Sequence, residues 1–195
     1  MAKLYFKYGA MGSSKSANAL ITKFNYEERH MKVWLIKPAI DDRDGADHIR
    51  SRIGLDSVAD VISPDDDIEA RLDTKGQIDV IISDESQFFT EAQIDSLRRI
   101  VDERGIPVLC FGLRTDFLTH LFPGSRRLFE VADSITEIKT ICDCGSKAIV
   151  NARIDAQGRI VTEGEQVLLG GNDRYIAMCH KCWSQKIKDQ NSGKV

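Results

Sequence analysis

Residues 4–16 read LYFKYGAMGSSKS, and three kinds of sequence follow one another within this stretch. An apolar, aromatic-rich run ends at Tyr8, a loop of small residues covers 9–16, and a segment with a helical pattern follows. The loop fits the phosphate-binding pattern G-x-x-x-x-G-K-[ST] at every fixed position but one, because Ser14 stands where the second glycine is usual. The stretch therefore predicts a strand, a phosphate-binding loop and a helix N-terminus.

The residue types in this loop suit a polyphosphate ligand. Consecutive backbone N–H groups and the positive end of a helix form a cradle for it. Lys15 would reach the outer phosphates as a point charge, and the Ser16 hydroxyl would ligate Mg²⁺. Serine is small, so we expect Ser14 to be tolerated. The alternative is that 9–16 is only a tight strand-to-helix turn.

The segment after the loop carries an apolar stripe of helical period. Ala17, Leu20, Ile21 and Phe24 fall at i, i+3, i+4 and i+7, which is typical of one face of an amphipathic helix. We expect this stripe to be core, and we assign it no chemistry.

Composition narrows the class of protein. The chain has 195 residues, 42% hydrophobic and 29% charged, with a formal net charge of −3. This length suits one substantial domain with a small annex. The acidic balance and the lack of a basic stripe speak against a nucleic-acid partner. No apolar run reaches transmembrane length, and the first residues do not read as a secretory signal, so we expect a cytoplasmic protein with no membrane partner.

A second part of the expected nucleotide site, a pair of acidic residues, follows the apolar run at 78–82, which reads IDVII. A carboxylate at the C-terminal tip of a strand can lie beside a phosphate loop and hold the water shell of Mg²⁺. Asp84 fits that role, and Glu85 would point toward the group that accepts the phosphate. The alternative is that both acids merely cap the coming helix.

Strand-like and helix-like segments alternate along the first 140 residues. Apolar runs at 33–36, 78–82, 107–112 and 134–140 predict further strands, and Thr90 with Gln93 resembles a capping box at the start of a helix that Gly105 ends. This alternation predicts an α/β fold of the P-loop (RecA-like) type, a parallel sheet flanked by helices with ligands at the C-terminal ends of the strands.

Between the strands, two polar segments hold candidate ligand-binding residues. We predict a long loop over 40–57, and one of its cations, Arg43, Arg50 or Arg52, is a candidate to face the phosphate site. Phe117 follows a strand end and could stack on a nucleobase or simply fill the packing. His120 has no obvious partner, so we assign it a structural or surface place.

The C-terminal part is distinguished by its cysteines. Cys142-x-Cys144 and Cys179-x-x-Cys182 are separated by 34 residues (145–178), and such pairs read as a tetrahedral Cys₄ zinc site of the ribbon type. A disulfide or redox role is the alternative. We therefore divide the chain into a nucleotide-binding core, 1–140, and a zinc-ribbon domain, 141–195.

The sequence also carries expectations for the fifth cysteine, for one histidine and for the C-terminal tail. Cys110 lies in an apolar run and is expected to be buried and inert. His180, inside the second cysteine pair, is a weaker candidate ligand. The polar residues 184–195 are predicted to be frayed.

Taken together, these motifs resemble the type II thymidine kinases. The resemblance extends from Lys3 to about Trp183. Its motifs are GAMGSSKS (9–16), DDR (41–43), SRIGL (51–55), DESQFF (84–89), FGLRTDF (111–117), the four cysteines and GGNDRY (170–175). Ser14 and the tight C-x-C pair are the departures from the family pattern.

The resemblance implies ATP-dependent phosphorylation of the 5′-hydroxyl of thymidine, with Mg²⁺ and structural zinc, a homotetramer and feedback inhibition by thymidine triphosphate. It implies that Glu85 is the general base and Arg43 an auxiliary cation, and that a loop over roughly 164–175 covers the nucleoside. The implied nucleotide contacts are Gly9, Ala10, Met11, Gly12, Ser13, Ser14, Lys15, Ser16, Asp84, Glu85, Ser86 and Gln87. The implied thymidine contacts are Met11, Phe88, Leu113, Phe117 and Tyr175.

Two other functions stay open from the residues alone. A zinc-ribbon P-loop ATPase acting on nucleic acid is the main alternative, since zinc ribbons often bind nucleic acid. A nucleotide-binding regulator without chemistry is the other, and it would leave Glu85 without a role.

Overall fold

Six parallel strands form the central sheet of the computed structural model, which describes residues 1–40, 47–167 and 175–192. The strand order is β5-β2-β6-β7-β1-β8, and each neighbouring pair is parallel. The strands are β1 (Leu4–Tyr8), β2 (Val33–Pro38), β5 (Asp60–Ile62), β6 (Val80–Ser83), β7 (Val108–Gly112) and β8 (Ser134–Glu137). The predicted α/β fold with a parallel sheet is confirmed.

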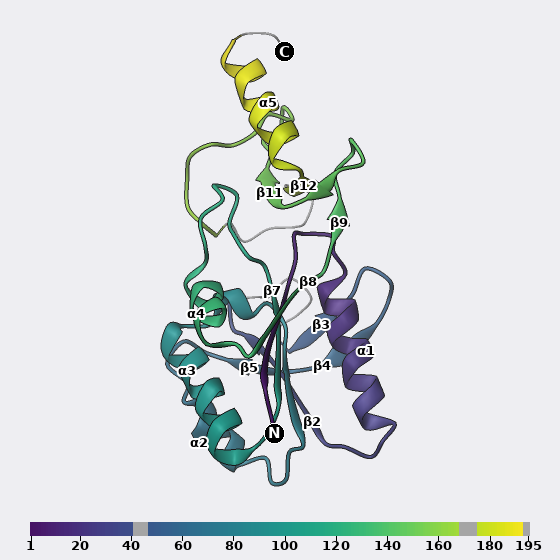
Figure 1. The fold of residues 1–195 in the computed structure, drawn as a ribbon, viewed down its shortest axis with the longest axis vertical. Coiled ribbons are helices and arrows are strands. Elements are labelled where there is room, and N and C mark those ends of the chain that lie inside the picture. Colours follow the sequence, from purple (N-terminus) through teal and green to yellow (C-terminus); the bar gives the residue numbers. More distant parts are fainter. Residues whose placement is uncertain (41–46, 168–174, 193–195) are drawn as a thin grey trace.

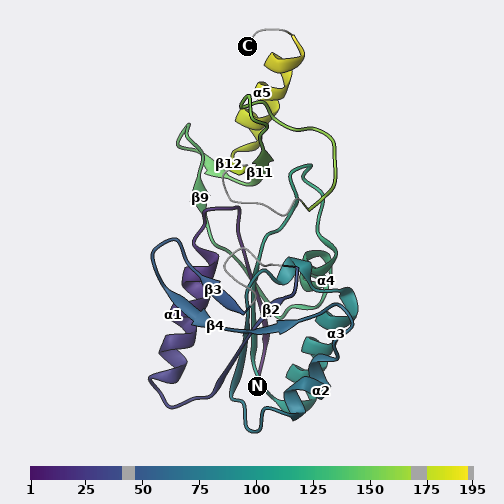
Figure 2. The same cartoon turned by 180° about the vertical axis from the view of Figure 1, so that it is seen from behind.

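Helices cover both faces of this sheet (Figures 1 and 2). Helix α1 (Lys15–Glu27) lies on one face, and α2 (Ile68–Asp73), α3 (Glu91–Arg99) and α4 (Pro123–Val131) lie on the other. Each face buries its own apolar cluster. Within the described ranges, no helix combines the length and the apolar character needed to cross a bilayer.

The predicted start and end of α3 are confirmed. The Thr90 hydroxyl accepts from the Gln93 N–H, and the Gln93 side chain accepts from the Thr90 N–H, which completes a capping box. The helix continues into η2 (Ile100–Arg104), and Gly105 then takes a left-handed φ of 66°.

The predicted apolar stripe of α1 is only half buried. Ala17 and Leu20 are 4% and 6% exposed, whereas Ile21 and Phe24 are 45% and 57% exposed. The buried residues of α1 all lie in its first half, where small alanines permit close approach to the sheet. The prediction that Ile21 and Phe24 are core is therefore wrong.

Part of the predicted loop over 40–57 is a β-hairpin. Strands β3 (His48–Arg50) and β4 (Asp56–Val58) pair antiparallel. Ile49, 2% exposed, belongs to the apolar cluster on the α1 face. This buried anchor gives the polar segment a fixed position that its charge-rich sequence did not indicate. Arg43 lies outside the described residues.

The C-terminal part stands at one end of the core, beyond the C-terminal ends of the strands (Figure 1). It contains β9 (Thr140–Ile141), β10 (Lys147–Ala148), β11 (Val150–Arg153), β12 (Tyr175–Met178) and α5 (His180–Asn191). Strand β9 pairs with β10, and β11 pairs with β12, both antiparallel. The domain boundary at 140/141 stays a prediction.

The expectation of a frayed tail over 184–195 is wrong for the residues that the structure describes. Helix α5 runs to Asn191, and the Cys179 sulfur caps its start by accepting from the Cys182 N–H. Near its other end, the Gln190 amide accepts from the Ile160 N–H at 2.6 Å and donates to the Ile160 carbonyl at 3.1 Å. These contacts hold a helix with a polar composition in place.

Candidate active site

The loop of residues 9–16 connects β1 to α1 at the C-terminal edge of the sheet (Figure 1). Lys15 is 7% exposed, and its ammonium group donates to the Ala10 carbonyl at 2.9 Å and to the Ser13 hydroxyl at 3.5 Å. The lysine therefore folds back over the loop that precedes it. This places a positive charge beside a row of backbone N–H groups at a helix N-terminus, which is a favourable arrangement for a polyphosphate.

Ser14 shows why glycine is usual at its position. Its φ of 60° and ψ of 32° lie in the left-handed region, and its side chain is exposed and makes no capping hydrogen bond. This conformation costs an L-residue roughly 1–2 kcal/mol of conformational free energy. The constraint at position 14 therefore comes from the backbone rather than from space for a side chain.

Ser14→Gly should stabilise the protein by about 0.5–1 kcal/mol, because glycine adopts a positive φ without steric cost and loses only part of that gain as unfolded-state entropy. Chemical denaturation of the two proteins measures the difference. Ser63→Gly is the matched control, since Ser63 is not among the positive-φ residues, and this change should destabilise. An equal loss of stability in both variants would contradict the strain at Ser14.

Asp84 follows the C-terminal end of β6 and has an unpartnered atom that fits a metal. It is 3% exposed, and its Oδ1 is buried without a hydrogen-bond partner among the described residues. Burial raises the pKa of Asp84 to about 7, and the charge of Glu85 adds to the rise, whereas Ser16 and Lys15 oppose it. A buried carboxylate oxygen with no partner, next to a serine hydroxyl, is a donor set that suits Mg²⁺.

Without added magnesium, Asp84→Asn should raise Tm by about 2–10 °C at pH 8.5 and change it little at pH 5. The sign follows from the raised pKa: the folded state binds the extra proton, so stability falls as pH rises from about 4 through 7. Thermal melts across pH measure this. Asp65→Asn, at an exposed acid, should show no such trend; a gain for Asp84→Asn that is independent of pH would contradict the assignment.

Glu85 adopts an unusual backbone conformation beside this acid. Its φ is 50°, a left-handed value, and it is 8% exposed. Such strain costs on the order of 1–3 kcal/mol and is concentrated at functional positions. The short helix η1 (Ser86–Phe88) begins immediately after it.

Gln87 holds the Glu85 carboxylate in place. Its side-chain amide donates to Glu85 Oε2 at 2.5 Å, and its carbonyl oxygen accepts from the Leu113 N–H at 2.9 Å. Gln87 is 1% exposed. The Gln87 side chain therefore links Glu85 to the segment after β7. The nucleotide contact expected at Gln87 stays a prediction.

Lys15, Ser16 and Glu85 line one cleft of about 340 Å³, which is within the usual size of a small-molecule site. Glu85 and Leu113 line it opposite the loop. The β3–β4 hairpin contributes a third side through residues 50–53, so Arg50 and Arg52 both reach the cleft. Two of the three arginines that the sequence offered as candidates to face the phosphate site are therefore at the cleft. The lining residues are Met11, Gly12, Ser14, Lys15, Ser16, Ala17, Arg50, Ser51, Arg52, Ile53, Glu85 and Leu113.

The residues expected to contact thymidine fall into two groups. Met11 and Leu113 line the cleft. Phe117 is 1% exposed, and the Arg153 guanidinium lies 3.7 Å from the centre of its ring. Tyr175 accepts a hydrogen bond from the same arginine at 2.9 Å. Sequence reasoning missed Arg153, because a single arginine in an alternating strand carries no local signal of its role.

Phe88 and the covering loop complete the expected set. The Phe88 ring packs edge-on against Phe122, with centroids 5.5 Å apart. Of the loop over 164–175, residues 168–174 lie outside the described part of the chain. Gln166, from the part that is described, donates to Asp116 at 2.9 Å, and its carbonyl accepts from Arg153 at 3.2 Å.

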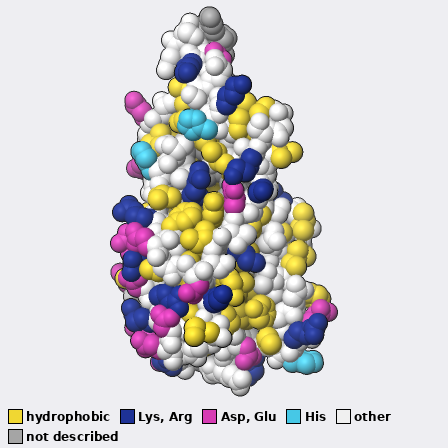
Figure 3. Space-filling view, in the orientation of Figure 1, with side chains coloured by type: hydrophobic (Ala, Val, Ile, Leu, Met, Phe, Trp, Pro, Cys, Tyr) yellow, Lys and Arg dark blue, Asp and Glu magenta, His cyan; other side chains and the backbone are white. Residues whose placement is uncertain are grey.

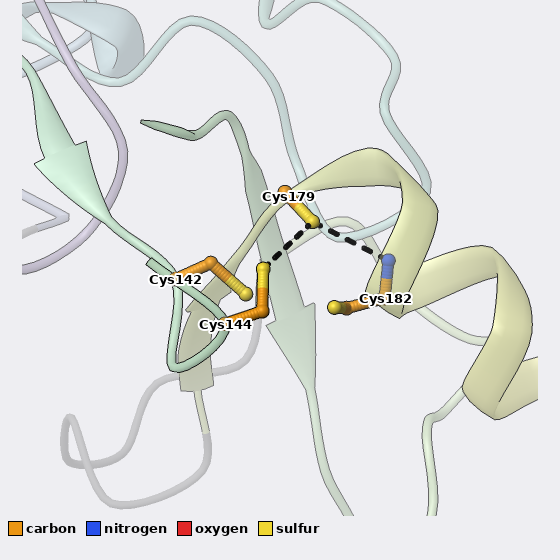
Figure 4. A group of neighbouring side chains, drawn as sticks. All are labelled: Cys142, Cys144, Cys179 and Cys182. Atoms are coloured by element: carbon orange, nitrogen blue, oxygen red, sulfur yellow. Dashed lines mark hydrogen bonds between the residues drawn. The ribbon is translucent and has the colours of Figure 1, made fainter. Parts of the chain in front are cut away.

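The four C-terminal cysteines converge on one point (Figure 4). All four sulfur atoms lie within 4.8 Å of one another, and those of Cys144 and Cys179 are 3.7 Å apart. Zinc bound tetrahedrally by thiolates at about 2.3 Å requires sulfurs about 3.8 Å apart. His180, the weaker candidate, is exposed and is not part of this cluster. The geometry fits a closed tetrahedral metal site and not a disulfide, since every cysteine is free.

The thiol pKa values also favour a bound cation. Hydrogen bonds from Ser146 lower the pKa of Cys144 to about 6. The adjacent Cys144 and Cys179 sulfurs raise the pKa of Cys182 to about 12. So many neighbouring thiols cannot all ionise without a positive charge between them, and coordination to a divalent metal removes that obstacle. Cys110, by contrast, is fully buried, and burial raises its pKa to about 12, as expected for an inert thiol.

Comparison with known proteins gives a consistent result over the whole chain. A family model described as thymidine kinase matches residues 2–183. A thymidine kinase of Ruegeria pomeroyi is 44% identical over 192 residues, with 97% of each chain covered. One of Rhizobium meliloti is 42% identical over 194 residues, which covers 97% of this chain and 100% of that one. A Pif1 helicase structure from Candida albicans covers 72% of this chain and 36% of its own at 16% identity and a TM-score of 0.42, a similarity too low to support a conclusion.

Proposed function

The chain belongs to the thymidine kinase family, and we propose that it transfers the γ-phosphoryl group of ATP to the 5′-hydroxyl of thymidine, giving thymidine monophosphate. The observation that carries the proposal is one cleft lined by both Lys15 and Glu85. A phosphate-binding cation and a carboxylate base in the same cleft are what phosphoryl transfer to an alcohol requires.

The loop of residues 9–16 holds the triphosphate. Its backbone N–H groups face the phosphates, and Lys15 neutralises charge on the outer ones. Ser16 and Asp84 hold Mg²⁺, which neutralises charge on the phosphate oxygens when bound. Arg43 is proposed as an auxiliary cation. Arg50 and Arg52 line the cleft, and they supply further positive charge near the transferring group.

Glu85 accepts the proton of the sugar hydroxyl as that oxygen attacks the γ-phosphorus. The hydrogen bond from Gln87 fixes the orientation of the carboxylate, and Gln87 is itself held by the Leu113 N–H. A base within a rigid backbone turn loses little entropy on reaching the reactive geometry. Ser86 and Gln87, which follow Glu85, are proposed as further nucleotide contacts.

The thymine base lies against the wall formed by Met11 and Leu113. Phe88, Phe117 and Tyr175 form the further part of the pocket, with the loop over roughly 164–175 as its cover. Because Phe117 is 1% exposed and Arg153 covers one face of its ring, Phe117 supports the wall of the pocket from behind Arg153.

The proposal is tested by measuring ADP formation with thymidine, single-stranded DNA or RNA as the added substrate. Thymidine should stimulate ATP turnover and yield thymidine monophosphate, and neither nucleic acid should do so. Stimulation by DNA or RNA alone would favour the nucleic-acid ATPase. Nucleotide binding without turnover under any of these conditions would favour a regulator.

Several finer properties are proposed on the family resemblance. The four cysteines hold one structural zinc ion per chain, and their reduced state suits the cytoplasm. Thymidine triphosphate acts as a feedback inhibitor, since its base and its phosphate tail match the two halves of the cleft. The assembled enzyme is a homotetramer, which requires apolar surface available for contact between chains.

Phe24→Gln should shift the native mass toward smaller species, because α1 exposes Phe24 and Ile21 to solvent. Hydrophobic side chains are visible along the α1 side of the molecule in Figure 3. Light scattering after size exclusion gives the mass. Asn25→Gln, at the exposed polar neighbour, should leave it unchanged. A wild-type protein that is monomeric at micromolar concentration would refute the proposed tetramer.

A further inference from the structure

Asn151 connects the loop of residues 9–16 to the segment that follows β7. It lies on β11, in the C-terminal part, and is 3% exposed. Its side-chain oxygen accepts from the Met11 N–H at 2.7 Å, and its side-chain nitrogen donates to the Thr115 carbonyl at 2.8 Å. These partners are 140 and 36 positions away in the sequence. One side chain thus links the zinc-ribbon part to the phosphate loop and to the segment after β7.

The chemistry of the two bonds requires an amide. Met11 offers a donor and Thr115 offers an acceptor, and a single Asn side chain supplies the matching acceptor and donor. Aspartate could accept from Met11 but would place an oxygen against the Thr115 carbonyl. Leucine has nearly the same shape and could make neither bond. The two partners also fix which atom of the Asn151 amide is oxygen.

Other hydrogen bonds of the loop are made within the loop itself or to the end of β7. Gly9 donates to Gly112 at 3.2 Å, Ser13 donates to the Ala10 carbonyl at 3.2 Å, and Lys15 donates to Ala10. The hydrogen bond from the Met11 N–H, by contrast, reaches the C-terminal part. Met11 precedes the left-handed residues Gly12 and Ser14, so its position sets where the strained bend begins.

We propose that Asn151 is a positioning residue that holds the phosphate loop in its nucleotide-binding conformation, and thereby couples the zinc-ribbon part to nucleotide affinity. The inference rests on the proposed function in so far as the loop binds nucleotide. Without Asn151, a partly buried N–H and a buried carbonyl lose their partners, and the loop gains freedom that nucleotide binding must then remove.

The test is the Kd for Mg²⁺–ADP measured calorimetrically on the zinc-loaded protein in the absence of thymidine. Asn151→Leu and Asn151→Ala should each weaken ADP binding by about tenfold, the equivalent of 1.4 kcal/mol. In turnover, KM for ATP should rise similarly while kcat at saturation falls by less than about threefold. Hydrogen exchange should speed up in peptides that cover 9–16.

Thr115→Val is the matched control. Its hydroxyl is buried in the same region without a partner among the described residues, and the backbone carbonyl that Asn151 uses is retained. ADP affinity of this variant should stay within about twofold of wild type, since no hydrogen bond to the loop changes.

Three outcomes would overturn the inference. The first is wild-type ADP affinity in folded, zinc-loaded Asn151 variants. The second is loss of zinc or of cooperative unfolding in both variants, which would show that Asn151 supports the fold as a whole. The third is an equal loss of ADP affinity in Thr115→Val. A wild-type protein that binds no ADP would instead refute the proposed function itself.

Discussion

Glu85→Gln should lower kcat by about 10²–10⁴-fold, the usual contribution of a positioned general base. Glutamine keeps the length and shape of the side chain, and its oxygen can still accept from Gln87, which holds Glu85 at 2.5 Å. What it loses is the ability to take the proton of the sugar hydroxyl. Steady-state kinetics with thymidine and ATP measure the effect, and substrate affinities should remain within about threefold because no binding group is removed.

The matched control for this substitution is Glu91→Gln, which makes the same chemical change at an exposed position in the first turn of α3. Its kcat should equal that of wild type. Near-normal turnover in Glu85→Gln would exclude Glu85 as the base. A large rise in KM with unchanged kcat would instead assign Glu85 to substrate binding.

Loss of zinc should unfold the C-terminal part and abolish activity. The apolar cluster around the cysteines is small: Cys142, Ala148 and Cys179 are its buried members, and α5 buries no residue fully. Structural zinc contributes about 10–16 kcal/mol of apparent binding free energy in small domains of this kind, far more than such a cluster can supply. Fresh protein should contain one zinc per chain, and Cys142→Ala should contain none.

Metal analysis and circular dichroism measure this second effect. Helical signal from α5 should fall together with zinc content, because the Cys179 sulfur both joins the cluster and caps the helix. Cys110→Ala, which changes a buried cysteine outside the cluster, should keep its zinc. Less than one zinc per chain in fresh wild-type protein would contradict the Cys₄ assignment, as would an unchanged α5 signal in Cys142→Ala.

Much of the framework was predictable because it depends on local spacing. The order of strand, small-residue loop and helix at 4–16 follows from neighbouring residues, and so does the capping box at Thr90. The cysteine pairs at 142–144 and 179–182 were identifiable for the same reason, since metal-ligand spacing is a local property. Asp84 at the tip of β6 was predicted from a strand pattern that ends in an acid.

Other features depend on which segments pack together, and these were missed. The burial of Ile49 turns a charge-rich segment, which was predicted to be a loop, into a hairpin. That hairpin brings two of the candidate cations, Arg50 and Arg52, to the cleft. Ile21 and Phe24 have the period of a buried stripe, yet they are exposed because α1 packs on the sheet mainly through its first half. Periodicity reports that a face is apolar, but not whether a neighbour within the same chain covers it.

The sequence by itself determined the fold class, the strand, loop and helix of residues 4–27, the acids after β6 and the four-cysteine cluster, because each is encoded by residues close together in the chain. The tertiary structure alone decided that Ser14 and Glu85 take left-handed backbone conformations and that Arg153 covers Phe117. It also decided that Asn151 bonds to Met11 across 140 positions. Such contacts arise only when distant segments meet, and the hydrogen-bonding needs of buried polar groups then select among the arrangements that the local pattern leaves open.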